Sequence, residues 1–508
     1  MPPPTFRPWS PRQAYLLAPS PADWVPEDHL VHFLLDVVEQ LDLSAIEERY
    51  RRKDPRGVKA YHPAMMVGLL LYSYCRGVMS SRKIARATYE DVATRYLVAD
   101  QHPHFTRIAD FRKEHLAELA GLFVQVLELC REAGLLKLGH VSLDGTKIQA
   151  NASKHKAMSH ERMEAEIPRL QDEIDALLAQ SQQVDEQEDE RLGEGQDEVD
   201  IPAELQRREK RLARIREAKA ALEAEAARTR AAELRDLAEG NEARAVESER
   251  PQKARRQAET RAANQRRKAD QLDPPSDDRD DDPPSDDPDD DEGGGRSSSD
   301  AELPTHSPKT RTDGRPDAKA QRNFTDPDSR IMKDGQGAFT QAYNAHAVVN
   351  DEQVIVVATL SNQAPDAQYL IPTLMTAITM AGEAPDKLTA DSGFFSQANA
   401  EWCEEQGIDA YIATGRRRHG ATADDAEQSA SSARAKMKAK VSSPEGDAIY
   451  RRRKATVEPV FGQIKEARGC RRFLLRGLEA VRLEWVLVCL THNLLKLHRA
   501  QLPAACAA

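Results

Sequence analysis

Three acidic residues, far apart in the chain, stand where a fold could bring them together. Asp144 follows the alternating segment HVSL, and Asp391 follows the short apolar segment KLTA. Each therefore lies at the end of an expected strand. Glu458 lies in a basic segment, 450–473, that is expected to be helical. Strand ends beside a helix are a natural place to build a site in an α/β sheet.

Such a group of carboxylates would bind hard divalent cations. Carboxylates at close range raise each other's pKa unless cations neutralise them, and oxygen ligands suit Mg²⁺ or Mn²⁺. Two such ions about 3.5–4 Å apart can activate a water or a 3′-hydroxyl during phosphodiester displacement. Each acid taken singly also has a commoner explanation. Asp144 would be a turn residue, Asp391 would cap a helix, and Glu458 would be the partner in an ion pair. Each acid by itself is therefore weak evidence, and the motifs around the three acids must decide between the two interpretations.

The segments around these acids predict an α/β layer. Residues 140–153 predict a strand, a tight turn and a second strand or loop, and residues 339–362 predict a hairpin. Strand and helix patterns alternate in 386–414, which indicates parallel strands. Helices are expected at 368–382 and over 445–500.

The N-terminal region is expected to be helical. Helices are predicted at 61–77, at 80–98 with Ser80 or Ser81 as the N-cap, and as a pair at 104–136. In the second helix the pattern places three residues inward and four in solvent. The inward residues are Ile84, Ala87 and Val92, and the exposed ones are Arg82, Lys83, Arg86 and Arg95. A helix-turn-helix that binds DNA and a plain helical bundle both fit this arrangement.

The middle of the chain is highly charged. Apolar residues step by 4 and 3 in two helical segments, which predicts an antiparallel pair of coiled-coil helices or, alternatively, a marginal solvated helix. They are Met163, Ile167, Leu170, Ile174 and Leu177, then Leu205, Leu212, Ile215 and Leu222. The basic segment 252–268 fits either a DNA contact or a solvated helix face. Residues 273–303 are rich in Asp, Pro, Ser and Gly and are expected to be disordered.

Charge and cysteine content limit the classes of protein to which this chain could belong. The net charge is −12, but residues 273–292 hold 12 acids and one Arg, so they contribute −11. Residues 416–476 hold 16 Lys and Arg against 7 Asp and Glu, a local +9 that suits phosphate. The six cysteines form no CxxC pair, and no apolar run reaches the roughly 18 residues of a membrane span. A reducing cytoplasm without membrane partners is expected.

The motifs in their order resemble those of the DDE transposases of bacterial insertion sequences. The front of the chain carries YHPAMMVGLLLYSYCRGVMSSRKIARA and HFTRIADFRKEH. SLDGTKIQANAS carries the first Asp, and DPDSRIMK, QAYNAHAVV and LSNQAPDAQ follow. LTADSGFFS carries the second Asp, and YRRRKATVEPVFGQIKEARGCRRFLLRG carries the third acid. The resemblance covers about 50–153 and 325–500, and it implies a ribonuclease-H-like catalytic core.

By that resemblance, Asp144, Asp391 and Glu458 would be the catalytic and metal-binding triad, with two Mg²⁺ or Mn²⁺ ions. Tyr450, Arg453 and Lys465 would hold the DNA backbone, and Glu458 and Lys465, seven residues apart, would share a helix face. The family's spacing of Tyr, Arg and Glu differs slightly here, so the neighbouring basic residues 451–454 compete for the arginine role. His346 and His492 are expected to be structural, and Asp366 and Asp334 to support the site.

The expected fold class is α/β, a ribonuclease-H-like mixed sheet with flanking helices, plus an all-α N-terminal domain and a helical, partly disordered insertion. The expected domains are a tail (1–24), a helical DNA-binding domain (25–138), the first catalytic strand (139–155), a helical or coiled-coil insertion (156–272), a disordered acidic linker (273–324), the remaining catalytic domain (325–500) and a tail (501–508).

The resemblance implies metal-dependent cleavage of element ends and strand transfer into target DNA. The partners would be double-stranded DNA and further copies of the chain, as a dimer or higher multimer, in the bacterial cytoplasm at the nucleoid. A nuclease of the same fold without strand transfer is the alternative within enzymes. A catalytically inert DNA-binding relic is the alternative outside them.

Overall fold

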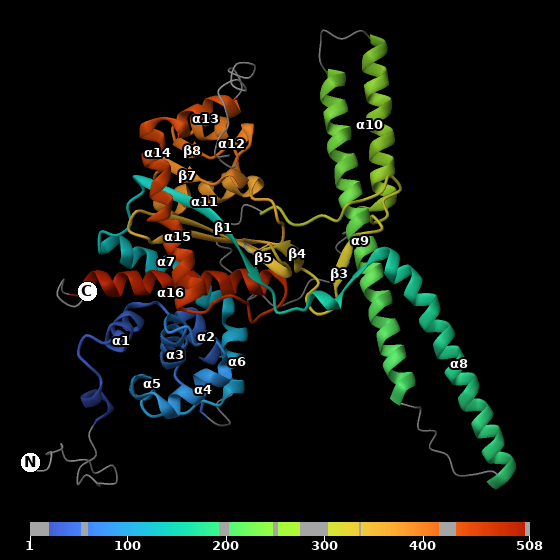
Figure 1. Ribbon diagram of the computed structural model, residues 1–508, viewed down its shortest axis with the longest axis horizontal. Coiled ribbons are helices and arrows are strands. Elements are labelled where there is room, and N and C mark those ends of the chain that lie inside the picture. The colour runs from blue at the N-terminus through green and yellow to red at the C-terminus, as the bar shows by residue number, and fades with distance from the viewer. Residues whose placement is uncertain are drawn as a thin grey trace, which may run out of the picture.

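The computed structural model describes residues 20–51, 59–192, 203–246, 252–274, 303–334, 337–415 and 433–502. These residues form a body in which helices surround a sheet and, beside it, a long arm of helices (Figure 1). The chain leaves the body after the first strand of the sheet, builds the arm and returns to complete the sheet. The arm is thus an insertion within the sheet-forming sequence.

The N-terminal part of the body is all helical, as predicted. Its elements are η1 (Pro21–Trp24), α1 (Leu30–Gln40), α2 (Ser44–Arg51), α3 (Pro63–Cys75), α4 (Ser81–Glu90), α5 (Val92–Leu97), α6 (Phe105–Glu114) and α7 (Leu116–Glu132). The predicted helix 80–98 is two helices, because Asp91 is extended and its side chain caps α5. Ile84 is buried as predicted, but Val92 is 37 % exposed at the start of α5, so its inward placement was wrong.

The body contains a six-stranded mixed sheet. Its strands are β1 (His140–Gln149), β4 (Arg330–Lys333), β5 (Phe339–Asn350), β6 (Ile355–Ser361), β7 (Lys387–Ala390) and β8 (Asp409–Ile412). The order is β4-β5-β1-β7-β8, and β6 also pairs with β5. β1, β7 and β8 are parallel, whereas β4, β5, β6 and β1 pair antiparallel. The predicted hairpin and parallel strands are confirmed, as is the ribonuclease-H-like α/β class.

β1 differs from its prediction. It is one continuous strand through Gly145, where the sequence predicted a tight turn. The reason is long-range pairing, since β5 matches β1 residue by residue from Val141↔Asn350 to Gln149↔Ala342. A local Asp-Gly turn preference is weak against a ladder of this length.

Two apolar clusters cover the two faces of the sheet. On one face lie α15 (Val457–Gly462), η8 (Gln463–Ala467, a π-helical turn) and α16 (Leu478–Gln501), which packs on the N-terminal helices. On the other lie η3 (Ala367–Tyr369), α11 (Leu370–Ala381) and α12 (Gln397–Glu405), and this cluster also includes residues of α13 (Ala433–Ser442) and α14 (Pro444–Arg451). Figure 1 shows α16 between the sheet and the N-terminal helices. The N-terminal helices and this face of the sheet therefore share one apolar cluster across α16.

The arm consists of three long helices and a small sheet at its base. Its elements are η2 (Lys154–Lys156), β2 (Ala157–Ser159), α8 (His160–Leu192), α9 (Ala203–Val246), α10 (Gln252–Leu272) and β3 (Gln321–Asn323). The first half of α9 packs on α8 through the predicted heptad residues, among them Leu170, Ile174, Leu212 and Ile215. β2 pairs antiparallel with β3. The predicted coiled-coil pair is confirmed.

The second half of α9 forms a hairpin with α10 through alanines (Figure 1). Buried alanines recur every seven residues on α9, and a matching pair lies on α10. They are Ala231, Ala238 and Ala245, then Ala262 and Ala269. Small side chains let two helices approach closely. This row of alanines, called the alanine seam here, therefore aligns the two helices while it buries little apolar surface.

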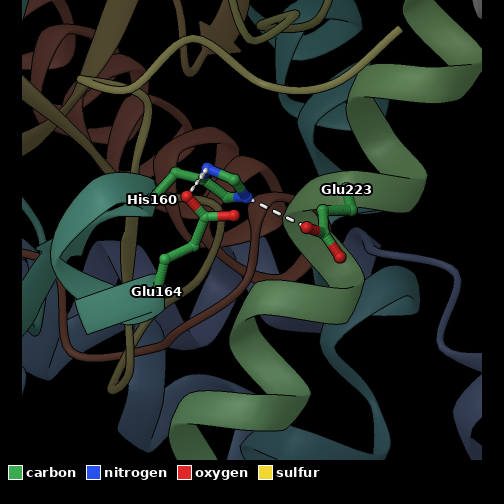
Figure 2. A group of neighbouring side chains, drawn as sticks. All are labelled: His160, Glu164 and Glu223. Atoms are coloured by element: carbon green, nitrogen blue, oxygen red, sulfur yellow. Dashed lines mark hydrogen bonds and ion pairs between the residues drawn. The ribbon is translucent and has the colours of Figure 1, made fainter. Parts of the chain in front are cut away.

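Ion pairs tie α8 to α9 near the base of the arm. His160, 2 % exposed, contacts Glu223 of α9 at 3.0 Å and lies 3.8 Å from Glu164 (Figure 2). Lys219 Nζ lies 3.1 Å from Glu223 and 3.8 Å from Glu164. The lysine therefore supplies one positive charge between the two carboxylates of this group.

The predicted acidic linker lies largely outside the described residues, since 275–302 are not described. Residues 303–324, which the prediction included in the linker, are described and contain β3. Disorder was therefore the wrong expectation for them, because β3 pairs with β2 and joins the arm to the body. No helix among the described residues is long and apolar enough to cross a membrane.

A buried histidine predicts acid sensitivity of the body. His492 on α16 is 1 % exposed, and its Nε2 lies 2.9 Å from the Gln353 carbonyl oxygen, to which it donates. Burial lowers the pKa of His492 to about 3. The unfolded chain would take up a proton near pH 6.5, whereas the folded chain would not. This contribution to stability is full above about pH 6.5 and is lost as the pH falls toward 3.

We therefore expect His492→Gln, which can keep the hydrogen bond to Gln353, to lose less stability on acidification than the parent. Thermal unfolding at about pH 7.5 and about pH 5.5 measures this difference. An equal drop in midpoint for both proteins would show that His492 does not contribute.

Candidate active site

The register of the sheet brings Asp144 and Asp391 together. The parallel pairing of β1 with β7 ends at Leu143↔Ala390, and the next residue on each strand is an aspartate. β1 continues along β5, whereas β7 stops and Asp391 caps the short helix η4 (Ser392–Phe394). Its carboxylate accepts a hydrogen bond from the Gly393 N–H at 2.9 Å. Two acids separated by the whole arm thus become neighbours at one sheet position.

Asp144 is half-buried, with the guanidinium of Arg453 beside it. Its Oδ2 lies 2.8 Å from Arg453 Nη2, and its Oδ1 accepts from the Gly145 N–H at 2.8 Å. Burial raises the pKa of Asp144 to about 6, the Arg453 charge opposes this rise, and the negative charges of Asp391 and Asp366 add to it. Negative charge therefore exceeds positive charge here, and a further cation would lower the free energy of the ionised carboxylates.

Arg453 is the basic residue that reaches the site. Its side chain is 8 % exposed and donates from Nη1 to the Tyr450 hydroxyl at 2.9 Å. Arg451 and Arg452 point elsewhere, to ion pairs with other acids at 2.6 Å each. The sequence left open which of the four adjacent basic residues 451–454 reaches the site. In the structure, Arg453 is the one that contacts Asp144. The DNA contacts of Tyr450 and Arg453 stay predictions.

Buried hydroxyls fix α15 on the strands that carry the aspartates. Ser142 Oγ lies 2.8 Å from Thr389 Oγ1 on β7 and 2.7 Å from Thr456 Oγ1, just before α15. At the other end, Lys465 Nζ donates to Thr146 Oγ1 at 2.8 Å. These contacts hold α15 and η8 along the face of β1 from which Asp144 projects.

Glu458 lies in the first turn of α15, between these two anchors, and is exposed. Among the described residues, no hydrogen bond or ion pair joins it to Asp144 or Asp391. Glu458 thus lies on a helix as predicted, and in the described chain the three carboxylates do not all lie within 4.8 Å of one another. The π-helical turn after Gly462 changes the angular relation between Glu458 and Lys465 that a regular helix would give.

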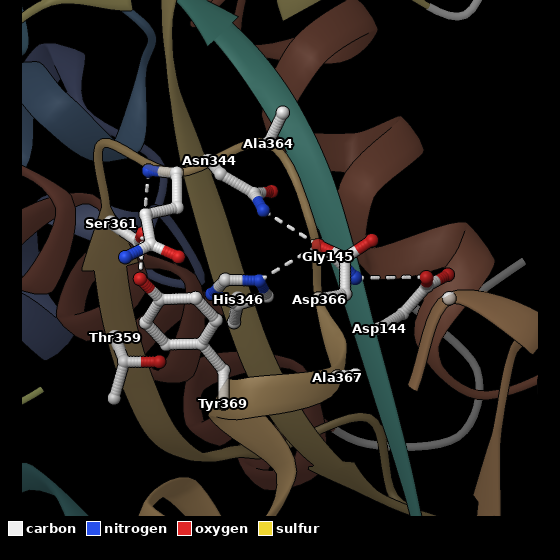
Figure 3. A network of polar contacts seen from close by, with 12 residues as sticks. Asp144, Gly145, Asn344, His346, Thr359, Ser361, Ala364, Asp366, Ala367 and Tyr369 are labelled. Carbon is white, nitrogen blue, oxygen red and sulfur yellow. Dashed lines mark hydrogen bonds and ion pairs between the residues drawn. The ribbon is translucent and has the colours of Figure 1, made fainter. Parts of the chain in front are cut away.

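A fourth acid, Asp366, lies behind the site. The sequence predicted only a supporting role for it and did not predict its hydrogen-bond network. Its Oδ1 accepts from Asn344 Nδ2 at 2.6 Å and Lys147 Nζ at 3.2 Å, and it lies 3.0 Å from His346 Nε2 (Figure 3). Burial opposes ionisation, but the His346 hydrogen bond and the Lys147 charge dominate and lower the pKa of Asp366 to about 2. Asp366 is therefore a fixed negative charge beside Asp144.

His346 is fully buried and stacks on Tyr369, with ring centroids 4.8 Å apart. Its structural role was expected, but its partner Asp366 was not, because β5 and the loop after β6 meet only in the folded sheet. The motif LSNQAPDAQ, which contains Asp366, was the available signal.

Two glycines make room for Asp366, and Figure 3 shows the first of them, Gly145. A Cβ at Gly145 would lie 2.9 Å from His346 Cδ2 and 3.1 Å from Asp366 Oδ1. A Cβ at Gly393 would lie 2.8 Å from Asp366 Oδ2. Each glycine stands one or two residues after a site aspartate, so Asp366 fits between the two strand ends only because both side chains are absent.

One other group could suit a metal. Among the described residues, the ligand atoms of His160, Glu164 and Glu223 lie within 4.8 Å of one another (Figure 2). Lys219 supplies positive charge to both glutamates, so we interpret this group as an ion-pair cluster that holds the arm. Asp144, Asp391 and Glu458 do not form such a preassembled group in the described chain.

The N-terminal basic residues lie on α4. Arg82, Lys83 and Arg86 are all exposed. Arg86 pairs with Glu90 at 2.7 Å, and the Arg82 guanidinium lies 5.1 Å from the centre of the Phe105 ring. All three remain accessible to a ligand, and their DNA contact stays a prediction.

Comparison with known families matches both ends of the chain. A family described as Transposase DDE domain matches residues 302–494, and a family described as Transposase domain matches residues 19–114. The two matches together cover more than half of the chain. Asp391 and Glu458 lie inside the first match, and Asp144 lies between the two. No curated protein and no solved structure shows significant similarity.

The ribonuclease-H-like sheet, the helical N-terminal region and these two matches define the class: the chain is a transposase. It belongs to the DDE transposases and is consistent with the enzyme of an insertion sequence. DNA binding and DNA transposition follow from that family, whose members typically use divalent metal ions.

The space around Gly145 yields a prediction. Gly145→Ala should destabilise the protein by about 1–3 kcal/mol, because the new methyl group overlaps His346 and Asp366. The matched control is Gly121→Ala in α7, where a Cβ meets nothing within 4 Å and where alanine should stabilise the helix by about 0.5–1 kcal/mol. Denaturant unfolding compares both with the parent. A Gly145→Ala protein as stable as the parent would contradict the packing described.

Proposed function

We propose that this transposase cleaves the ends of its own element in a metal-dependent reaction and joins them to target DNA. The observation that supports this most is the meeting of Asp144 and Asp391 at the end of β1–β7 pairing. Burial is the largest cause of the raised pKa of Asp144, and a divalent cation beside this carboxylate would favour its ionised form. Carboxylate oxygens in such a setting fit Mg²⁺ or Mn²⁺.

Asp144 and Asp391 would hold the metal, and Glu458 would join them from α15. When bound, a pair of such ions would activate the attacking water or 3′-hydroxyl and stabilise the leaving oxygen. Glu458 is exposed, and Thr456 and Lys465 on either side of α15 are anchored to β1, so the Glu458 carboxylate would reach the metal by a change of side-chain rotamer. Asp366 would stay ionised behind the site and keep its potential negative.

Basic side chains next to the acids would hold the DNA backbone. Arg453 contacts Asp144 and Tyr450 and could exchange part of these contacts for a phosphate oxygen, to which guanidinium binds well. Lys465, which donates to Thr146, lies on the same face of β1 as Asp144. Backbone contacts of this kind position DNA without reading its sequence.

We propose that residues 25–138 form the DNA-binding domain, with Arg82, Lys83 and Arg86 of α4 on its DNA surface. The remaining predicted boundaries, with the insertion at 156–272 and the catalytic domain at 139–155 and 325–500, complete the proposed organisation. Two element ends must be held together for joining, so a dimer or higher multimer on DNA is proposed. From the same role, we propose that the protein acts at the nucleoid in a bacterial cytoplasm.

The catalytic acids are tested by cleavage of a labelled duplex that carries the element's own end. Asp144→Asn, Asp391→Asn and Glu458→Gln should each lower the cleavage rate roughly 100-fold or more with Mg²⁺ or Mn²⁺, because each removes a charged metal ligand. Chelation by EDTA should abolish cleavage by the parent. The control is Glu404→Gln, an exposed acid on α12, which should cleave like the parent.

Thermal unfolding and a gel-shift measurement on each variant separate loss of catalysis from loss of folding or DNA binding. Parent-like cleavage by folded Asp391→Asn would overturn the assignment of the site.

Strand transfer is tested with a duplex end that already carries a free 3′-hydroxyl, mixed with a supercoiled target plasmid. We expect joined products with the parent protein and none when the end carries a 3′-dideoxynucleotide, since the attacking oxygen is then missing. Cleavage without joining would instead support a nuclease of the same fold. Specific binding with neither reaction under any metal would support a DNA-binding relic.

A further inference from the structure

One face of α10 carries positive charge only. Its members are Lys253, Arg256, Arg261, Arg267 and Lys268, all exposed, and they are called the α10 basic face here. Projected at 3.6 residues per turn, they fall within less than half of the helix circumference. The acids of this helix, Glu259 and Asp270, fall outside that arc.

The opposite side of α10 is occupied by contacts with α9. Ala262 and Ala269 are buried in the alanine seam, and Arg266 pairs with Glu242 at 2.6 Å. Asp270 pairs with Arg235 at 3.5 Å. These contacts fix the rotation of α10 on α9, so the basic face is presented to solvent as a unit.

The basic face differs from the rest of the arm in how its charges are used. Along α8 and the first half of α9, several basic residues pair with acids, as in Arg169–Glu166 at 2.7 Å and Arg208–Glu173 at 3.1 Å. In the described chain, no ion pair engages any member of the α10 basic face. A helix that needed only solubility would be expected to mix both signs in this way on every exposed face.

Neutral hydrogen-bonding residues fill the positions between the charges. Gln257, Thr260 and Asn264 lie on the same arc. Lys253, Arg256 and Arg261 also line a shallow surface depression with Gln252, Gln257 and Thr260. Arginine, lysine and neutral side-chain donors without acids are the composition that contacts phosphates.

We infer that the α10 basic face is a second DNA-binding surface, which takes the phosphate backbone of duplex DNA without reading its sequence. α10 has 21 residues and is therefore about 30 Å long. That length matches roughly nine steps of duplex at 3.4 Å each. The α9–α10 hairpin projects from the body (Figure 1), so this surface would engage DNA outside the segment at the catalytic acids. The inference goes beyond the proposed catalytic role, because binding by this face requires neither metal nor chemistry.

The test is binding of the full-length protein to fluorescein-labelled duplexes in EDTA, with and without the element-end sequence, over a range of salt concentrations. The variant combines Lys253→Gln, Arg256→Gln and Arg267→Gln. The matched control combines Lys210→Gln, Arg211→Gln and Arg214→Gln, which removes the same charge from exposed positions on the first half of α9.

We expect the α10 variant to bind both duplexes about tenfold or more weakly. The slope of log affinity against log salt should fall by about 0.9 for each lost phosphate contact. The control should bind within about twofold of the parent. Far-ultraviolet circular dichroism verifies that helix content is kept, as glutamine is a good helix former.

Equal losses in the α10 variant and the control would show a general charge effect and overturn the inference. So would parent-like binding and salt slope in the α10 variant. Since the assay contains no metal, neither result bears on the catalytic acids, whose failure would appear only in the cleavage experiment.

Discussion

The parallel pairing of β1 with β7 is the constraint on which the site depends. Four paired residues align the two strands so that the next residue on each is an aspartate. A register shift of one residue would turn Asp144 to the opposite face of the sheet, away from α15 and Arg453. The antiparallel partner β5 runs the whole length of β1 and makes such a shift costly. Buried hydroxyl contacts among Ser142, Thr389 and Thr456 tie the helix of the third acid to the same register.

The electrostatics of the site follow from this packing. Three carboxylates, those of Asp144, Asp391 and Asp366, interact across β1 and the end of β7, and their nearby cations are Arg453 and Lys147. Lys147 and His346 hold Asp366 ionised, whereas Asp144 is left with a raised pKa because it is half-buried with one arginine. A cation beside Asp144 would therefore lower the free energy of its ionised form. The same packing also explains why glycines stand at positions 145 and 393, where any side chain would displace Asp366.

The arm shows how a large insertion can be accommodated without disturbing the sheet. It leaves after β1 and returns through β3, whose pairing with β2 closes its base. Ion pairs around His160 and the apolar heptads hold α8 to α9, and the alanine seam holds α9 to α10. Because each interface is local, the arm can be long while the core remains packed around β1 and α16.

The sequence by itself determined the fold class, the helical N-terminal region, the hairpin, the coiled-coil pair and the family, because these depend on local periodicity and on motifs. It also named Asp144, Asp391 and Glu458 as candidates, but local patterns placed a turn at Gly145 and one helix over 80–98. Only the tertiary structure decided that β1 runs on, that Arg453 rather than its neighbours meets Asp144, and that Asp366 lies between the strand ends. The physical reason is that strand register, burial and charge neighbours arise from residues distant in the chain, which local propensity does not encode.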